Sequence, residues 1–145
     1  MRLNLQSDYA LRMLMHLAAS DGGRVTIQQV AERYGISQTH LMKVAHILGR
    51  EGFIQTARGR SGGLRLARPA AGIVIGDVVR RMEGDFALVD CLPGGARTCL
   101  ITPACRLKGV LGEALGAFLA VLDRYTLADL TADNPGLRSL LGEAA

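Results

Sequence analysis

The sequence predicts a mainly α-helical chain with a small β-hairpin, arranged as a winged helix-turn-helix followed by one long helix. Three observations support this fold class. Apolar residues recur at intervals of three and four through several segments, two strand-like runs flank a Gly/Ser turn, and a long amphipathic stretch begins near residue 105. The 145 residues amount to one typical domain, and 49% hydrophobic residues with only 4% aromatics predict an aliphatic core.

The first twenty residues predict an amphipathic helix. Asp8, Arg12 and His16 interrupt the apolar run about once per turn, and no small-residue cleavage site follows. This pattern indicates neither a signal peptide nor a membrane span. We therefore expect a cytoplasmic protein without membrane contact, in a compartment that keeps thiols reduced.

Two short helices joined by a turn come next. Residues 26–34 begin with Thr26 as a candidate N-cap, Gly35 ends this helix, and residues 37–50 begin with Ser37 as the second candidate N-cap. The second helix has a regular apolar stripe, formed by Leu41, Val44, Ala45 and Leu48. Two short helices around a tight turn with Gly are the helix-turn-helix layout.

A hairpin rich in arginine follows directly. Residues 53–69 contain four arginines in or beside the turn: Arg58, Arg60, Arg65 and Arg68. Residues 1–70 contain ten Lys/Arg against four Asp/Glu, a net charge of +6, whereas residues 71–145 contain seven against nine, a net charge of −2. The basic first half predicts double-stranded operator DNA as a partner. A basic hairpin without a nucleic-acid partner is the alternative.

The helix-turn-helix interpretation names the residues that contact DNA. We expect the major groove to be read by the outward residues near the start of the recognition helix, Gln38, Thr39, His40 and Lys43. Arg58 and Arg60 on the wing are expected to reach phosphates or a minor groove. The alternative for these side chains is an ordinary solvated surface.

The second half of the chain predicts one short helix at residues 74–82, an irregular segment, and a long amphipathic helix that begins at Pro103. A stripe of about five turns needs a wider partner surface than one small domain offers, which predicts a homodimer. Packing within its own chain is the alternative. A last short helix at residues 126–133 is followed by Asn134-Pro135-Gly136, which predicts a break and a tail.

All the cysteines lie within fifteen residues: Cys91, Cys99 and Cys105. Seven and five residues separate them, which is too open for a Cys-x2-Cys zinc knuckle and fits an iron–sulfur cluster, although a structural zinc module is the alternative. Thr102 as an N-cap would place Cys105 in the first helical turn, where the helix dipole favours a thiolate. Three thiolates leave one iron of such a cluster without a protein ligand. Lys108, one turn after Cys105, ligates poorly while protonated, so the fourth ligand must come from elsewhere, for example from the second subunit.

These residues resemble the NsrR and IscR family of dimeric, winged-helix, iron–sulfur transcription regulators over nearly the whole chain. The resemblance lies in residues 7–12, residues 34–37 with His40 and Lys43, residues 58–63 with Leu66, residues 75–80, the three cysteines and residues 125–130. Within the family, Asp8 and residues 101–108 are most similar to the members that sense nitric oxide.

The resemblance implies a homodimeric DNA-binding repressor, not an enzyme, that loses DNA affinity when nitric oxide reacts with its cluster. It implies a 4Fe-4S cluster, with 2Fe-2S as the second choice, held by Cys91, Cys99, Cys105 and Asp8 of the partner subunit. From the residues alone, Asp8 is only an acid in the first turn of a helix.

Two other functions are alternatives. The long gap between Cys91 and Cys99 resembles iron-responsive members of the family, so regulation by iron or by cluster supply is the alternative function. IscR-type members have a histidine ligand where this chain has Lys108, so we do not expect histidine ligation of the cluster here. An iron–sulfur electron carrier fits poorly, because the sequence has no Gly-rich phosphate loop and no paired catalytic carboxylates.

The sequence thus predicts three parts. Residues 1–83 form a winged helix-turn-helix DNA-binding domain, residues 84–104 a cluster-binding loop, and residues 105–145 a dimerisation helix and C-terminal tail.

Overall fold

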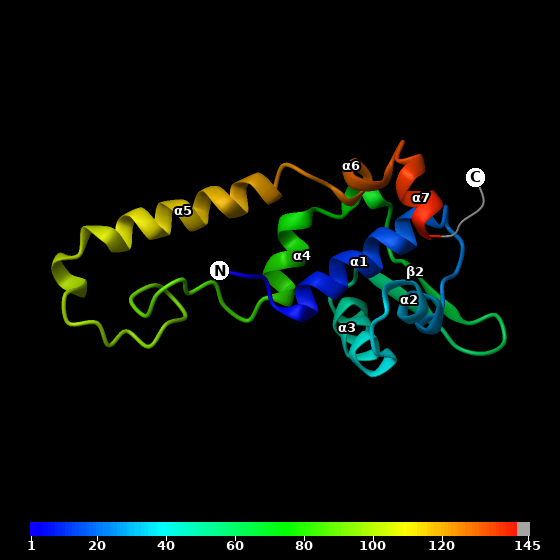
Figure 1. Cartoon of the computed structure of the whole chain (residues 1–145), viewed down its shortest axis with the longest axis horizontal. Coiled ribbons are helices and arrows are strands. Elements are labelled where there is room, and N and C mark those ends of the chain that lie inside the picture. The colour runs from blue at the N-terminus through cyan, green and yellow to red at the C-terminus, as the bar shows by residue number, and fades with distance from the viewer. Residues whose placement is uncertain (142–145) are drawn as a thin grey trace.

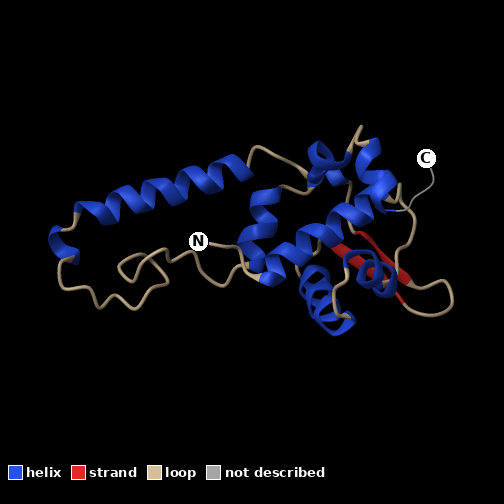
Figure 2. Ribbon diagram, in the orientation of Figure 1, coloured by secondary structure: helices blue, strands red, loops and turns tan. Residues whose placement is uncertain are grey.

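A computed structural model of the chain describes residues 1–141. The elements run α1 (Leu5–Ala19), α2 (Ile27–Tyr34), α3 (Gln38–Arg50), β1 (Ile54–Ala57), β2 (Gly63–Leu66), α4 (Ile75–Met82), α5 (Arg106–Leu122), α6 (Leu127–Thr131) and α7 (Pro135–Leu141). Short 3-10 helices span Ala70–Gly72 and Thr102–Ala104. Helices dominate and the strands form one small hairpin (Figure 2), which confirms the predicted fold class.

The helix-turn-helix forms where its local signals predict it. Thr26 caps α2 in a capping box with Gln29, and Gly35 ends the helix in the left-handed conformation with φ of 63°. All four predicted stripe residues of α3 are buried. Ser37 occupies the N-cap position of α3, but within residues 1–141 its side chain makes no capping hydrogen bond.

The wing is an antiparallel hairpin in which Ile54 pairs with Leu66 and Ala57 with Gly63. Val25, from the segment before α2, adds a bridge to the outer edge of β2. Its amide donates to the carbonyl of Leu64 at 3.1 Å and its carbonyl accepts from the amide of Leu64 at 2.7 Å. A single bridging residue has no alternating pattern, so the sequence did not indicate it.

Helices α1–α4, the hairpin, α6 and α7 form the winged-helix body, in which α1 lies at the centre and contacts α3, α4, α6 and α7 (Figure 1). Its inner face is fully buried at Ala10, Met13 and Leu14. The surrounding core is aliphatic, as predicted, and among the described residues Phe53 is the one buried phenylalanine or tyrosine in it. Such a core holds α3 and the wing in a fixed relation to α1.

The C-terminal segment differs from the prediction. Residues 134–136 do not begin a tail, because α7 starts at Pro135, which fits the first helical position. The side chain of the preceding residue, Asn134, accepts a hydrogen bond from the amide of Leu137 at 3.0 Å. Leu127 and Leu141 are buried, so α6 and α7 return to the body beside α1. Residues 142–145, also placed in the tail, lie outside the described residues, and the three-part division stays a prediction.

Helix α5 stands apart from the winged-helix body (Figure 1). The chain leaves α4, runs outward through residues 83–104, and returns along α5, which meets the body at α4. None of the helices in residues 1–141, including α5, is long and apolar enough to cross a membrane.

The predicted apolar stripe of α5 divides into two faces. The first is half-buried and turns toward its own chain, where Leu115 and Phe118 line a pocket with Leu3, Phe86 and Leu88. The second face is exposed: Leu107 is 59%, Val110 60% and Val121 43% exposed. No side chain of α5 is fully buried within the described chain, so its own subunit covers only part of the stripe.

Candidate DNA interface and cluster site

The predicted base-reading residues lie together on one exposed face. Gln38, Thr39, His40 and Lys43 occupy the first two turns of α3 and are all exposed, opposite the buried stripe that holds the helix against α1. The structure therefore brings the four residues together at the start of α3, where a recognition helix contacts base edges.

His40 has a packing partner that the sequence did not reveal. Its ring stacks on Tyr9 of α1, with ring centroids 6.4 Å apart and an interplanar angle of 27°. Tyr9, His40 and Lys43 line a small surface pocket between α1 and α3. The His40 side chain is therefore held by stacking on Tyr9, although it is exposed to solvent. The sequence did not predict this role of Tyr9, because a local pattern does not indicate which helix its ring will contact.

The four arginines of the wing divide into two pairs. Arg65 donates to the Gln55 side chain across the hairpin at 3.1 and 2.9 Å, and the Arg68 guanidinium lies 5.0 Å from the centre of the Phe53 ring. Arg58 and Arg60 lie exposed in the connecting loop and form no ion pair within residues 1–141. The two arginines predicted to contact DNA are therefore the two that are not engaged in the hairpin itself.

The wing loop is tied to the body at its tip. The Arg24 guanidinium donates a hydrogen bond to the backbone carbonyl of Ser61. This contact links the loop to the segment that also supplies Val25 to the sheet. The loop between the strands is therefore anchored through Ser61, while the side chains of Arg58 and Arg60 in the same loop are exposed to solvent.

The three cysteines are free thiols in or beside the irregular segment between α4 and α5. Cys91 and Cys105 are half-buried and Cys99 is exposed. The backbone turns back on itself between the first two: the amide of Arg97, a residue with φ of 57°, donates to the carbonyl of Asp90 at 2.8 Å. The side chain of Leu92, next to Cys91, is buried and restrains this part of the loop.

The prediction that Cys105 lies in the first turn of the long helix is wrong. Residues Thr102–Ala104 form a separate 3-10 turn, and Cys105 is the N-cap of α5. The Thr102 hydroxyl donates to the carbonyl of Cys99 at 2.8 Å, so it closes the loop between the two cysteines instead of capping the helix. Cys105 consequently sits at the start of α5, directly before its free amides.

Asp8 lies in the first turn of α1, as predicted, with its carboxylate on Arg12. The Arg12 Nη2 to Asp8 Oδ2 distance is 2.8 Å and the Nε to Oδ1 distance is 3.0 Å. Arg12 in turn lies 6.0 Å from the centre of the Tyr34 ring, and the Tyr34 hydroxyl donates to the Arg12 carbonyl at 3.2 Å. Burial raises the pKa of Tyr34, with Arg12 acting in the opposite direction, so the phenol keeps the proton that it donates.

One subunit does not assemble the predicted ligand set. Within residues 1–141, no group of three or more His, Cys, Asp or Glu side chains is gathered closely enough to hold a metal ion. The chemistry of the donors nevertheless fits an iron–sulfur cluster, since all three thiols are free and none is consumed in a disulfide.

Comparison with known proteins gives consistent matches along the chain. The Rrf2 family model, described as an iron-dependent transcriptional regulator, matches residues 3–133. The HTH-type transcriptional regulator NsrR of Bacillus subtilis (strain 168) is 49% identical over 142 residues, covering 97% of each chain. The regulator of the same name from Geobacillus kaustophilus (strain HTA426) is 50% identical over 144 residues, covering 99% of this chain and 98% of the relative.

Solved structures agree with the fold. The oxidized form of Staphylococcus aureus CymR has a TM-score of 0.73 and 28% identity, covering 91% of this chain and 97% of that chain. T. potens IscR has a TM-score of 0.71 and 27% identity, covering 92% of this chain and 88% of that chain. The resemblance seen in the sequence is confirmed, and the chain belongs to the Rrf2 family of iron-dependent transcriptional regulators.

Proposed function

We propose that this transcription regulator is a homodimeric DNA-binding repressor whose iron–sulfur cluster responds to nitric oxide. The observation that supports it most directly is the loop of three free cysteines joined to a helix, α5, that buries none of its side chains fully in its own subunit. The relatives named HTH-type transcriptional regulator NsrR support the DNA-binding part of this proposal.

The ligands that we propose are Cys91, Cys99 and Cys105 of one subunit and Asp8 of the partner subunit. The cluster, when bound, would supply iron that reacts with nitric oxide. The chain's own part is to hold that group between subunits: the cysteine loop is attached to α5, and Asp8 belongs to the helix that packs on α3. Ligands from both subunits would fix the two recognition helices relative to each other, so their release would lower DNA affinity.

The DNA contacts that we propose follow the exposed face of α3 and the wing. Gln38, Thr39, His40 and Lys43 would read base edges in the major groove, and Arg58 and Arg60 would bind phosphates or enter a minor groove. Their exposure and the absence of ion pairs at both arginines within the described residues support this assignment.

Replacing Arg60 with Ala is expected to weaken operator binding and to reduce its dependence on salt. Each lost phosphate contact lowers the slope of log affinity against log salt by roughly 0.9. Fluorescence anisotropy over a salt series measures both quantities. Arg124→Ala is the matched control, because Arg124 is exposed just after the end of α5 and belongs to neither α3 nor the wing. An Arg60→Ala variant with unchanged affinity and an unchanged slope would remove the wing from the DNA interface.

Replacing Asp8 with Ala is expected to leave a cluster on three thiolates with an altered spectrum and weaker coupling to DNA. Arg12→Gln is the control, since it breaks the same ion pair but keeps the carboxylate. An exposed pair four residues apart contributes only about 0.3 to 0.5 kcal/mol, so neither change should unfold α1. Equal cluster spectra for Asp8→Ala and the natural protein would show that the carboxylate is not a ligand.

Mixed dimers test the cross-subunit arrangement. One subunit that lacks the three cysteines, paired with one that lacks Asp8, retains one complete site if the carboxylate comes from the partner and none if it comes from the same subunit. We expect one normally ligated cluster per mixed dimer by iron and sulfide analysis and absorbance. Mixed dimers with no such cluster would contradict ligation across the interface.

Regulation by iron or cluster supply is the second candidate, favoured by the family's description as iron-dependent. An anaerobic titration of the reconstituted protein distinguishes the two signals. Cluster absorbance and operator binding are followed together, first with nitric oxide and then with an iron chelator. We expect stoichiometric nitric oxide to release the DNA before the chelator does.

A further inference from the structure

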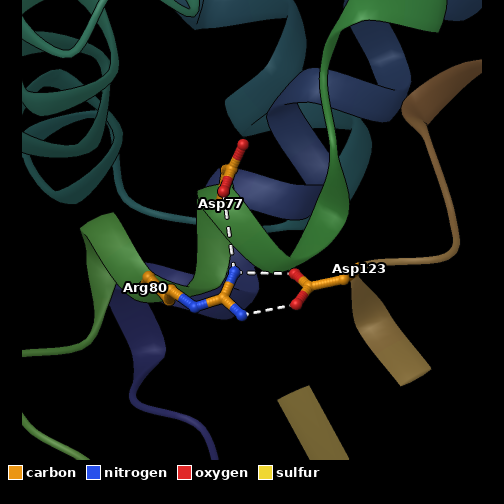
Figure 3. A network of polar contacts seen from close by, with 3 residues as sticks. All are labelled: Asp77, Arg80 and Asp123. Carbon is orange, nitrogen blue, oxygen red and sulfur yellow. Dashed lines mark hydrogen bonds and ion pairs between the residues drawn. The ribbon is translucent and has the colours of Figure 1, made fainter. Parts of the chain in front are cut away.

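A bidentate ion pair joins the end of α5 to α4 (Figure 3). Asp123 is the C-cap of α5, directly after Leu122, and Arg80 lies on α4. The Arg80 Nη1 donates to Asp123 Oδ1 and Nη2 donates to Oδ2, each at 2.6 Å, while Asp77 lies 3.6 Å from Nη1. Hydrogen bonding to Arg80 holds the pKa of Asp123 below its ordinary value, so both partners are charged at neutral pH. A parallel pair of hydrogen bonds restrains orientation as well as distance.

The same junction includes a glycine and a pair of backbone hydrogen bonds. A β-carbon at position 76 would overlap the Asp123 carboxylate, so Gly76 leaves the space that the ion pair occupies. Immediately after Asp123, the amide of Ile75 donates to the carbonyl of Tyr125 at 2.9 Å, and the amide of Leu127 donates to the carbonyl of Ile73 at 2.8 Å. We call Gly76, Arg80 and Asp123 the α4–α5 clamp.

The other end of α4 is tied to α1. Glu83, directly after α4, accepts hydrogen bonds from the amide of Asn4 at 2.9 Å and from the hydroxyl of Ser7 at 2.5 Å. Ser7 immediately precedes Asp8, and α1 packs on α3. Helix α4 therefore connects the end of α5 to the helix that supports the recognition helix.

We propose that Arg80 and Asp123 are positioning residues that set the angle of α5 against the winged-helix body, and thereby the spacing of DNA half-sites that the dimer accepts. This inference rests on the proposed function, in which α5 joins the two subunits. The 17 residues of α5 span roughly 25 Å, so a rotation of about 10° at the clamp displaces the far end by roughly 4 Å. That displacement exceeds one base-pair step of about 3.4 Å along a strand.

The test measures spacing preference. A duplex selected from a random-sequence library by the natural protein serves as the probe, together with derivatives in which the spacer between half-sites is one or two base pairs longer or shorter. Arg80→Gln and Asp123→Asn are compared with Arg124→Gln, which removes a charge beside the clamp without touching it. Dimer mass and melting temperature are recorded for every variant.

Both clamp variants are expected to bind the selected duplex roughly 5- to 10-fold more weakly and to discriminate less between spacers, with dimer mass and melting temperature nearly unchanged. Arg80→Gln makes the protein less positive and Asp123→Asn makes it more positive, so a general charge effect would move their affinities in opposite directions. Gly76→Ala should reproduce the spacing defect by steric displacement of Asp123, although alanine favours the helix.

The outcomes separate this inference from the proposed function. If the natural protein selects no duplex, the DNA-binding proposal fails. If it selects one, and the clamp variants keep its affinity and its spacer preference as Arg124→Gln does, the clamp has no positioning role. Equal weakening on every spacer, accompanied by loss of the dimer, would likewise overturn positioning in favour of a merely structural contact.

Discussion

Serine in place of Cys99 is expected to abolish the iron–sulfur cluster while the winged-helix body stays folded. Cys99 is exposed and contributes nothing to the core, and its backbone carbonyl, which accepts from Thr102, is unaffected by the change. A neutral serine hydroxyl is a harder and weaker ligand for iron than a cysteine thiolate, and the proposed site already includes one oxygen ligand in Asp8. Iron and acid-labile sulfide per subunit in anaerobically purified protein should fall to background, with an unchanged circular dichroism spectrum.

The same loss of the cluster is expected when Cys91 or Cys105 is replaced by serine. Position 105 distinguishes an effect on the cluster from an effect on the fold most clearly. Because Cys105 is the N-cap of α5, serine there is a favoured capping residue and should maintain the helix. Thr98→Ala, at an exposed position of the same loop, is the control and should keep full iron and sulfide. Cysteine variants that retain the full content would refute the assignment, and zinc without sulfide in the natural protein would favour the structural zinc module.

Glutamate at both Leu107 and Val110 is expected to convert the dimer into a monomer. These side chains are 59% and 60% exposed in a single subunit, and a symmetric interface would bury each of them twice. Burial of one such side chain stabilises by about 1.5 to 3 kcal/mol, so the loss of four weakens association by several orders of magnitude. Sedimentation equilibrium measures the dissociation constant, and binding to a two-half-site duplex should fall in parallel.

The control for this change lies on the same helix. Ala120→Glu adds charge on the side of α5 that already carries Glu113, seven residues earlier, and should leave the dimer intact. A dimer that survives the Leu107 and Val110 changes would show that α5 is not the subunit interface, and the cross-subunit role of Asp8 would lose its geometric basis.

Several parts of this protein were determined by local sequence alone. Thr26 caps the start of α2 and Gly35 ends it, because a capping side chain and a left-handed glycine act on backbone groups only a few residues away. The stripe of α3 and the strands around the arginine loop follow the same short-range logic, since helical and extended periodicities decide which side chains share a face. The three cysteines were predicted to be ligands from residue type and spacing alone, and this assignment stays a prediction.

Only the tertiary structure decided how those faces are used. The stripe of α5 says which side chains avoid water but not what covers them, and the fold turns Leu115 and Phe118 inward while it leaves Leu107 and Val110 exposed. Arg80 and Asp123 are 43 residues apart, and no local pattern pairs them. Tyr9 meets His40 for the same reason. Periodicity is a property of neighbours along the chain, whereas these contacts exist only because the packed core brings distant helices to fixed positions.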